Sequence, residues 1–349
     1  MEISSPKRRS SVATALAIAL AIWLALGARI WASAAPFNPA PLFERAEHFS
    51  TKINGDLADI YFPVPSNLAT ERDLFPTALI LQGTNVDKSN YSRFADAIAR
   101  YGFIVVVPNH LRKFAVVPGL ARMGLLPDQQ QVIDVLAHMK EVNSDPSSPI
   151  FSLLDPGKLV LLGHSMGGVA GLNAIQGTCV PPFCLGGFAR PAELVGGVFY
   201  GTNLKGHFGK AIRPINNGGI PTALVQGSLD SQSKSAEAQA TYNQIQNPPK
   251  ALVTVLGTNH YGRTNSNNPA NPPGIPPATP APIAPTLDQA EAIETIARWS
   301  ALFLRAHVLG DLGAFDYVHR TGALMDETVS VLSQTQPVPE RPGEKKPPS

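Results

Sequence analysis

An apolar run that leads into Gly-His-Ser-Met-Gly at 163–167 constrains this chain more than any other feature. Residues 159–162 are all aliphatic, as in a strand covered on both faces, and residues 169–175 are typical of a buried helix. The pattern Gly-x-Ser-x-Gly between a strand and a helix predicts a sharp turn that holds a serine clear of a sheet. The flanking glycines avoid collisions at such a turn, so Ser165 is a candidate nucleophile.

Strands alternate with helices along most of the chain. Apolar runs and helical periodicity predict strands at 47–53, 56–64, 77–81, 103–107, 159–162, 194–200, 222–226 and 251–256, and helices near 92–101, 128–142, 169–175, 233–244 and 287–309. Asn54-Gly55 between the first two strands is typical of a tight hairpin. The sequence therefore predicts an α/β fold with a mostly parallel central sheet, an N-terminal antiparallel hairpin and helices on both faces.

Length and composition allow one large folded domain. The chain has 349 residues, of which 44% are hydrophobic and 15% are charged, so it can bury a sizeable core. We expect the domain to cover 36–332 and to contain an irregular surface loop at 265–285, where Asn and Pro are frequent. The polar, Pro-rich residues 333–349 are predicted to form a disordered tail.

The N-terminus has the order of an export signal. Lys-Arg-Arg at 7–9 precedes an uncharged, mostly apolar stretch at 10–28, and Ala-Ser-Ala at 32–34 suits a cleavage site. Residues 1–35 are thus predicted to be a signal peptide. The apolar stretch also approaches the ~20 residues that span a bilayer, so an uncleaved anchor that associates the protein with a membrane is the alternative. Both interpretations predict a protein exported to the periplasm or secreted.

Charge and cysteine content exclude some partners. The formal net charge is +2, but residues 1–34 contribute +3, so the remainder is close to neutral and no nucleic-acid partner is expected. The chain has two cysteines, Cys179 and Cys184, and a local disulfide is the first expectation for an exported protein. The pair alone offers too few ligands for a metal, and we expect no metal and no organic cofactor.

A nucleophilic serine needs a base and an acid that orients the base. For a serine on a strand-to-helix turn, the acid and then the histidine follow along the chain, each at the end of a strand. Asp230 follows the predicted strand 222–226, and His260 follows the strand 251–256. His207, His307 and His319 do not directly follow a predicted strand, which leaves His260 as the candidate base.

An anion hole should accompany this set. The Met166 N–H lies at the predicted start of a helix, where backbone N–H groups lack partners and favour negative charge. A second donor is expected from the turn after the strand 77–81, and Thr84 is our choice. His164 and Tyr261 flank catalytic positions, and we expect them to pack or to shape the cleft rather than to react.

With these motifs, at 163–168, 227–230 and 257–260, the chain resembles the α/β-hydrolase superfamily over about residues 45–310. Within it, the chain is similar to the exported esterase branch that includes cutinases, platelet-activating-factor acetylhydrolases, chlorophyllases and dienelactone-hydrolase-like proteins. The resemblance implies a Ser165–His260–Asp230 triad and ester hydrolysis through an acyl-enzyme.

We expect a monomeric enzyme that acts on a small-molecule or lipid-like ester. Two alternatives stay open at this point. One is an acyltransferase that uses the same triad, and the other is a binding protein that has the fold without catalysis.

Overall fold

The computed structural model describes residues 37, 39–65, 74–117, 120–205 and 211–335. The chain divides into residues 1–38 and 39–349, and every described residue except Phe37 belongs to the second unit. The predicted signal peptide or anchor at 1–35 and the predicted tail beyond residue 335 lie outside the described residues. Among the described helices, none combines the length and the hydropathy needed to cross a membrane.

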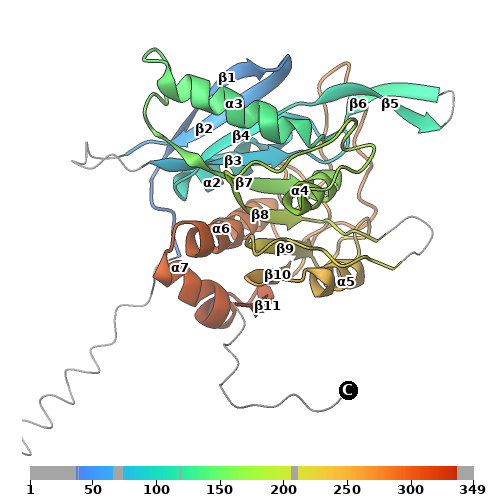
Figure 1. Ribbon diagram of the computed structural model, residues 1–349. Helices are drawn as coiled ribbons and strands as arrows, with labels where there is room; N and C mark the ends of the chain where they lie inside the picture. The colour runs from blue at the N-terminus through green and yellow to red at the C-terminus, as the bar shows by residue number, and fades with distance from the viewer. Residues whose placement is uncertain (1–36, 38, 66–73, 118–119, 206–210, 336–349) are drawn as a thin grey trace, which may run out of the picture. The chain divides into compact units, whose positions relative to one another are not determined.

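A nine-stranded sheet forms the centre of the second unit, in the order β1-β2-β4-β3-β7-β8-β9-β10-β11 (Figure 1). Its strands are β1 (Ala46–Ile53), β2 (Asp56–Pro63), β3 (Phe75–Leu81), β4 (Ile104–Pro108), β7 (Leu154–His164), β8 (Leu194–Tyr200), β9 (Thr222–Gly227), β10 (Lys250–Val255) and β11 (Val329–Gln334). The six strands from β4 to β10 in this order run parallel, whereas β1, β2 and β11 pair antiparallel with their neighbours. The prediction of an α/β fold with a mostly parallel sheet and an N-terminal hairpin is thus confirmed.

Helices cover both faces of this sheet because its parallel strands are apolar on both sides. Every residue of β3 is buried, and so is every residue of β7 from Leu159 to His164. The helices α3 (Gln130–Ser144), α4 (Met166–Gln176) and α5 (Ser235–Gln244) lie along one face, and α2 (Ser92–Arg100) and α6 (Gln289–Val308) pack together on the other (Figure 1). The described residues also form the short helical elements η1 (Lys88–Tyr91), α7 (Leu312–Asp316), η3 (Tyr317–Thr321) and α8 (Gly322–Met325).

Three strands were not predicted. The hairpin of β5 (Leu111–Val117) and β6 (Leu120–Leu125) forms a separate two-stranded sheet that projects from the body (Figure 1). The strand β11 includes Ser333 and Gln334, so the prediction of a disordered tail from residue 333 is wrong for these two residues. Their backbones pair with Ala251 and Lys250 of β10, and this long-range pairing orders polar residues that show no hydrophobic pattern.

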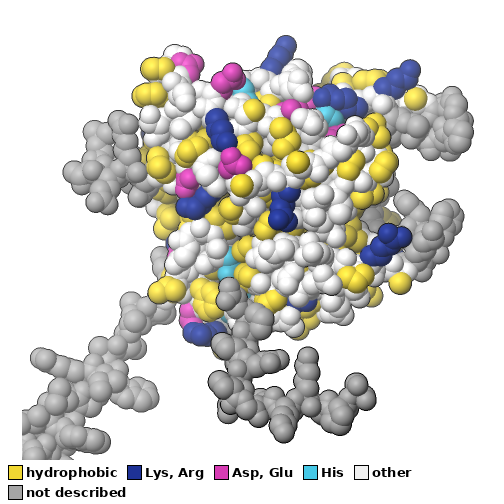
Figure 2. Space-filling view, viewed as in Figure 1, with side chains coloured by type: hydrophobic (Ala, Val, Ile, Leu, Met, Phe, Trp, Pro, Cys, Tyr) yellow, Lys and Arg dark blue, Asp and Glu magenta, His cyan; other side chains and the backbone are white. Residues whose placement is uncertain are grey.

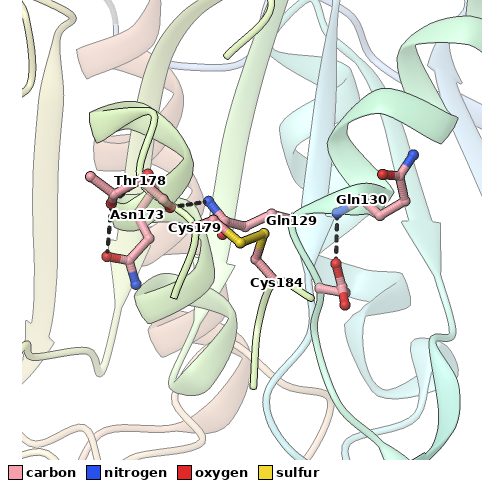
Figure 3. The surroundings of a disulfide bond; sticks show 7 residues. Gln129, Gln130, Asn173, Thr178, Cys179 and Cys184 are labelled. Atoms are coloured by element: carbon pink, nitrogen blue, oxygen red, sulfur yellow. Dashed lines mark hydrogen bonds between the residues drawn. A yellow bond between two sulfur atoms is a disulfide. The ribbon is translucent and has the colours of Figure 1, made fainter. Parts of the chain in front are cut away.

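The predicted disulfide between Cys179 and Cys184 is present in the loop after α4 (Figure 3). Gln129, which lies just before α3, fixes this loop. Its side-chain amide donates to the Thr178 carbonyl over 2.9 Å, and its backbone N–H donates to the Phe183 carbonyl over 2.8 Å. The bridge therefore stiffens a local connection between α4 and β8.

Charged side chains of both signs are interspersed on the face shown in Figure 2. Apolar side chains lie between them as scattered groups. This mixture of signs agrees with the near-neutral net charge of the chain beyond residue 34.

Candidate active site

Ser165 lies on a strained turn between β7 and α4. Its φ of +52° and ψ of −120° are unusual for a residue with a side chain, and its N–H donates to the Tyr200 carbonyl of β8 over 2.9 Å. The neighbouring glycines are needed for space. A Cβ on Gly167 would lie 2.1 Å from the Leu81 carbonyl oxygen, and one on Gly163 would lie 2.5 Å from the Cα of Gly168.

The histidine and the acid form a buried pair. His260 Nδ1 lies 2.8 Å from Asp230 Oδ2, and both side chains are almost wholly buried. A carboxylate only accepts hydrogen bonds, so the proton of this bond belongs to Nδ1 and the neutral ring presents Nε2 as a base. The other oxygen, Asp230 Oδ1, accepts the N–H groups of Gln232 and Ser233, each over 2.9 Å. The carboxylate is thereby held in place.

The sheet places the serine, the acid and the histidine at one edge. Ser165, Asp230 and His260 follow β7, β9 and β10, and the carboxyl ends of parallel strands lie at the same edge of a sheet. The structure joins His260 to Asp230 directly. The Ser165 hydroxyl makes no hydrogen bond to His260 in this arrangement of the described residues. Such bonds are often long without substrate and shorten when substrate binds.

The turn after β3 leaves one backbone N–H without a partner. Gly83 N–H donates to the Tyr91 hydroxyl over 2.8 Å, and Asn85 N–H donates to the Leu125 carbonyl over 2.9 Å. Between them, the Thr84 N–H has no acceptor among the described residues. Met166 is the first residue of α4, where an N–H has no partner within the helix. These are the two N–H groups for which the sequence predicts an oxyanion role, and that role stays a prediction.

The end of β8 adds a residue that the sequence analysis missed. Gly201 has a φ of +57°, and a Cβ there would lie 3.0 Å from Asp230 Oδ2 and 3.1 Å from His260 Nδ1. The next residue, Thr202, donates its hydroxyl to the Ser165 carbonyl. The rule of strand ends that located Asp230 and His260 would also have located Gly201, because it follows the predicted strand 194–200.

A buried polar group lies behind the turn. His164 Nδ1 is 2.9 Å from the Tyr91 hydroxyl, and His164 Nε2 is 2.9 Å from the His260 carbonyl oxygen. Arg263 Nη1 donates to the Gly163 carbonyl over 2.9 Å, and its guanidinium lies 4.0 Å from the centre of the Phe94 ring. Burial lowers the pKa of Arg263 to about 10. The expectation that His164 packs rather than reacts agrees with its full burial.

The predicted irregular loop at 265–285 contains no helix or strand, but its asparagines attach it to the site. Asn271 Nδ2 donates to the Asn85 carbonyl over 2.8 Å, next to Thr84. At the other end, the Thr279 carbonyl accepts the Tyr261 hydroxyl and, over 3.2 Å, the Gln232 side-chain amide. The loop thus connects the turn after β3 with the turns that hold the acid and the base.

The other histidines considered from the sequence lie elsewhere. His307 Nε2 and His319 Nε2 lie 2.8 Å apart, in α6 and η3. His207 is outside the described residues. Within the described part of the chain, no group of three or more His, Cys, Asp or Glu residues could hold a metal ion.

No protein-family model matches the chain, and no curated protein matches it either. The chemistry of the site therefore rests on its own residues. These comprise a hydrogen-bonded His260–Asp230 pair, a serine on a strained turn, and two backbone N–H groups without acceptors among the described residues, one directly after that serine and one in the turn after β3. This combination suits nucleophilic catalysis of acyl transfer.

Proposed function

We propose that this protein is an exported serine hydrolase with an α/β-hydrolase fold, and that it cleaves carboxylic esters through an acyl-enzyme. The observation that supports this most strongly is the 2.8 Å contact between His260 Nδ1 and Asp230 Oδ2 at the sheet edge where Ser165 also lies. The chain order of serine, acid and histidine, each after a strand, supports the same fold.

The mechanism follows from the donors and acceptors of the site. His260 Nε2 takes the Ser165 proton while Oγ attacks the ester carbonyl carbon, and the Thr84 and Met166 N–H groups hold the oxyanion. Asp230 stabilises the imidazolium through Nδ1. The imidazolium then gives its proton to the departing alcohol. Water, deprotonated by the same nitrogen, attacks the acyl-enzyme and releases the acid together with free Ser165.

Small-molecule or lipid-like esters are the proposed substrates. Ser165 is partly accessible and Met166 is 37% exposed, so an acyl group can reach the nucleophile from solvent. The loop at 265–285 borders the turn that includes Thr84, which makes it a candidate wall for the substrate. No metal or organic cofactor takes part in the proposed steps.

Export is proposed from two features. The order of charged, apolar and small residues at 1–35 predicts a signal or anchor. The Cys179–Cys184 bridge fits an oxidising compartment, where disulfides persist.

The test is hydrolysis of p-nitrophenyl esters with acyl chains from C2 to C16. We expect wild-type activity, and we expect Ser165→Ala to lower kcat by about 10⁴-fold or more because no nucleophile remains. Ser144→Ala, an exposed serine at the end of α3, is the matched control and should keep full activity.

Labelling by a fluorophosphonate separates the alternatives. Labelling of wild type but not of Ser165→Ala supports the serine hydrolase, and a rise in ester product with added alcohol would indicate an acyltransferase instead. A folded wild-type protein that neither hydrolyses any ester nor reacts with the fluorophosphonate would refute the proposed function and favour a binding protein.

A further inference from the structure

Three hydrogen bonds form a continuous chain behind the turn that holds Ser165. Gly83 N–H donates to Tyr91 Oη over 2.8 Å, Tyr91 Oη lies 2.9 Å from His164 Nδ1, and His164 Nε2 lies 2.9 Å from the His260 carbonyl oxygen. The Tyr91 and His164 side chains are fully buried, so water does not compete for these bonds. This series of hydrogen bonds begins at Gly83, beside Thr84, and ends at the candidate base His260.

The directions of these bonds follow from the groups at the two ends. The His260 carbonyl oxygen can only accept, so His164 Nε2 has a proton. In a neutral ring, His164 Nδ1 is then an acceptor, and the Tyr91 hydroxyl must be its donor. Tyr91 Oη in turn accepts the Gly83 N–H. Every member of the chain is satisfied in this one arrangement, and reversing His164 would leave two acceptors facing each other at His260.

We infer that Tyr91 and His164 are positioning residues. They hold the turn after β3, which contains Thr84, and the candidate base His260 in a fixed position relative to each other. This inference rests on the proposed function. Gly83 precedes Thr84, so a fixed Gly83 N–H orients the peptide next to the proposed oxyanion donor. At the other end, the bond to the His260 carbonyl holds the backbone of the residue whose ring acts as base.

The packing supports a precise fit between the two halves of the site. A Cβ on Gly83 would lie 2.9 Å from His164 Nδ1, so the turn approaches the ring as closely as a residue without a side chain allows. The His164 ring centre lies 5.1 Å from that of His260 and 5.8 Å from that of Tyr91. A movement of the His164 ring would therefore displace both the turn and the base.

The surroundings of His164 keep its ring neutral, as this arrangement of hydrogen bonds requires. Burial, followed by the charges of His260 and Arg263, holds the pKa of His164 well below its ordinary value. The other titratable groups that face the ring, Tyr200 and Tyr261, have pKa values raised by burial, so they stay uncharged at neutral pH. His164 Nδ1 thus stays an acceptor for the Tyr91 hydroxyl at neutral pH.

The experiment compares Tyr91→Phe with Tyr101→Phe in the full-length protein. Tyr101 is the matched control because its side chain is also buried and its hydroxyl donates to the Pro39 carbonyl, away from the site. In Tyr91→Phe we expect amide exchange at Gly83, followed by NMR, to become at least about 10-fold faster. We also expect kcat for the best ester to fall by about 10- to 100-fold, with KM within about 3-fold.

Two readouts do not depend on activity. In the wild type, ¹⁵N NMR of the imidazoles should show His164 neutral with its proton on Nε2, and this result needs no variant to fold. A proton on Nδ1, equal Gly83 exchange in wild type and Tyr91→Phe, or equal losses of kcat in the two Phe variants would each overturn the inference. A wild type without esterase activity and without fluorophosphonate labelling would instead refute the proposed function, while exchange and tautomer still report on the hydrogen-bond chain.

Discussion

Gly201 lies next to both the acid and the base. It follows β8, and its φ of +57° lies in the left-handed region that favours glycine. Any side chain there would also point at the contact between His260 Nδ1 and Asp230 Oδ2. Two separate physical demands, conformation and space, thus coincide at this position.

We predict that Gly201→Ala lowers kcat by about 100-fold, because a Cβ 3.0 Å from Asp230 Oδ2 has to push the acid or the base by some tenths of an ångström. The measurement is steady-state hydrolysis of the best p-nitrophenyl ester. Gly310→Ala is the matched control, since its φ of +71° is similar but no other group lies within 4 Å of the added Cβ. Similar losses of activity in both variants would show that backbone strain, and not contact with the pair, is responsible.

At the scale of elements, a pair of histidines joins three C-terminal segments. His307 of α6 and His319 of η3 share a hydrogen bond of 2.8 Å between their Nε2 atoms, and His319 Nδ1 lies 2.9 Å from Ser333 Oγ of β11. The contact needs at least one neutral ring, because two imidazolium rings have no acceptor to offer each other. Burial lowers the pKa of each histidine to about 4.

We predict that this pair makes stability depend on pH between about 6.5 and about 4. In that window the unfolded chain, whose histidines have pKa values near 6.5, binds more protons than the folded one. The contribution of this pair to the free energy of unfolding should therefore fall as the pH falls through the window and level off below about 4. Urea unfolding of wild type and of His307→Gln/His319→Gln from pH 8 to pH 4 tests this.

The pH 8 values show the effect of the substitutions when both histidines are neutral. Relative to that reference, the double variant should lose less stability than wild type on acidification, since it lacks both titrating groups. Equal losses in the two proteins would contradict the prediction.

At the scale of the whole molecule, one sheet holds every residue of the proposed site. Ser165, Asp230 and His260 follow its parallel strands β7, β9 and β10, and Thr84 follows β3 at the same edge. The helices on both faces bury this sheet on its two sides. The site can therefore keep its geometry only while the sheet as a whole is intact.

We predict that the sheet and the site unfold together. With the disulfide intact, urea titrations followed by far-UV circular dichroism and by ester hydrolysis should give the same midpoint, as expected for one cooperative unit. Loss of activity at a clearly lower urea concentration, with circular dichroism unchanged, would show that the edge of the sheet opens on its own.

Local patterns in the sequence were enough to predict the fold class and the main candidates of the site. Buried strands and amphipathic helices have regular periods, so the parallel α/β arrangement was predicted and the structure confirms it. The same patterns were enough to predict that Ser165, Asp230 and His260 each follow the end of a strand. The structure shows Asp230 and His260 in contact, whereas the chemical roles of all three residues stay predictions.

Tertiary structure alone decided the features that join segments far apart in the chain. The bonds from Gly83 through Tyr91 and His164 to His260, the pairing of β11 with β10, and the attachment of Asn271 to Asn85 all connect residues with no shared local pattern. Such contacts depend on where the folded sheet places each turn. The local sequence around a side chain does not show whether it makes such a contact or faces water. Periodicity is a property of one element, and these contacts are properties of their assembly.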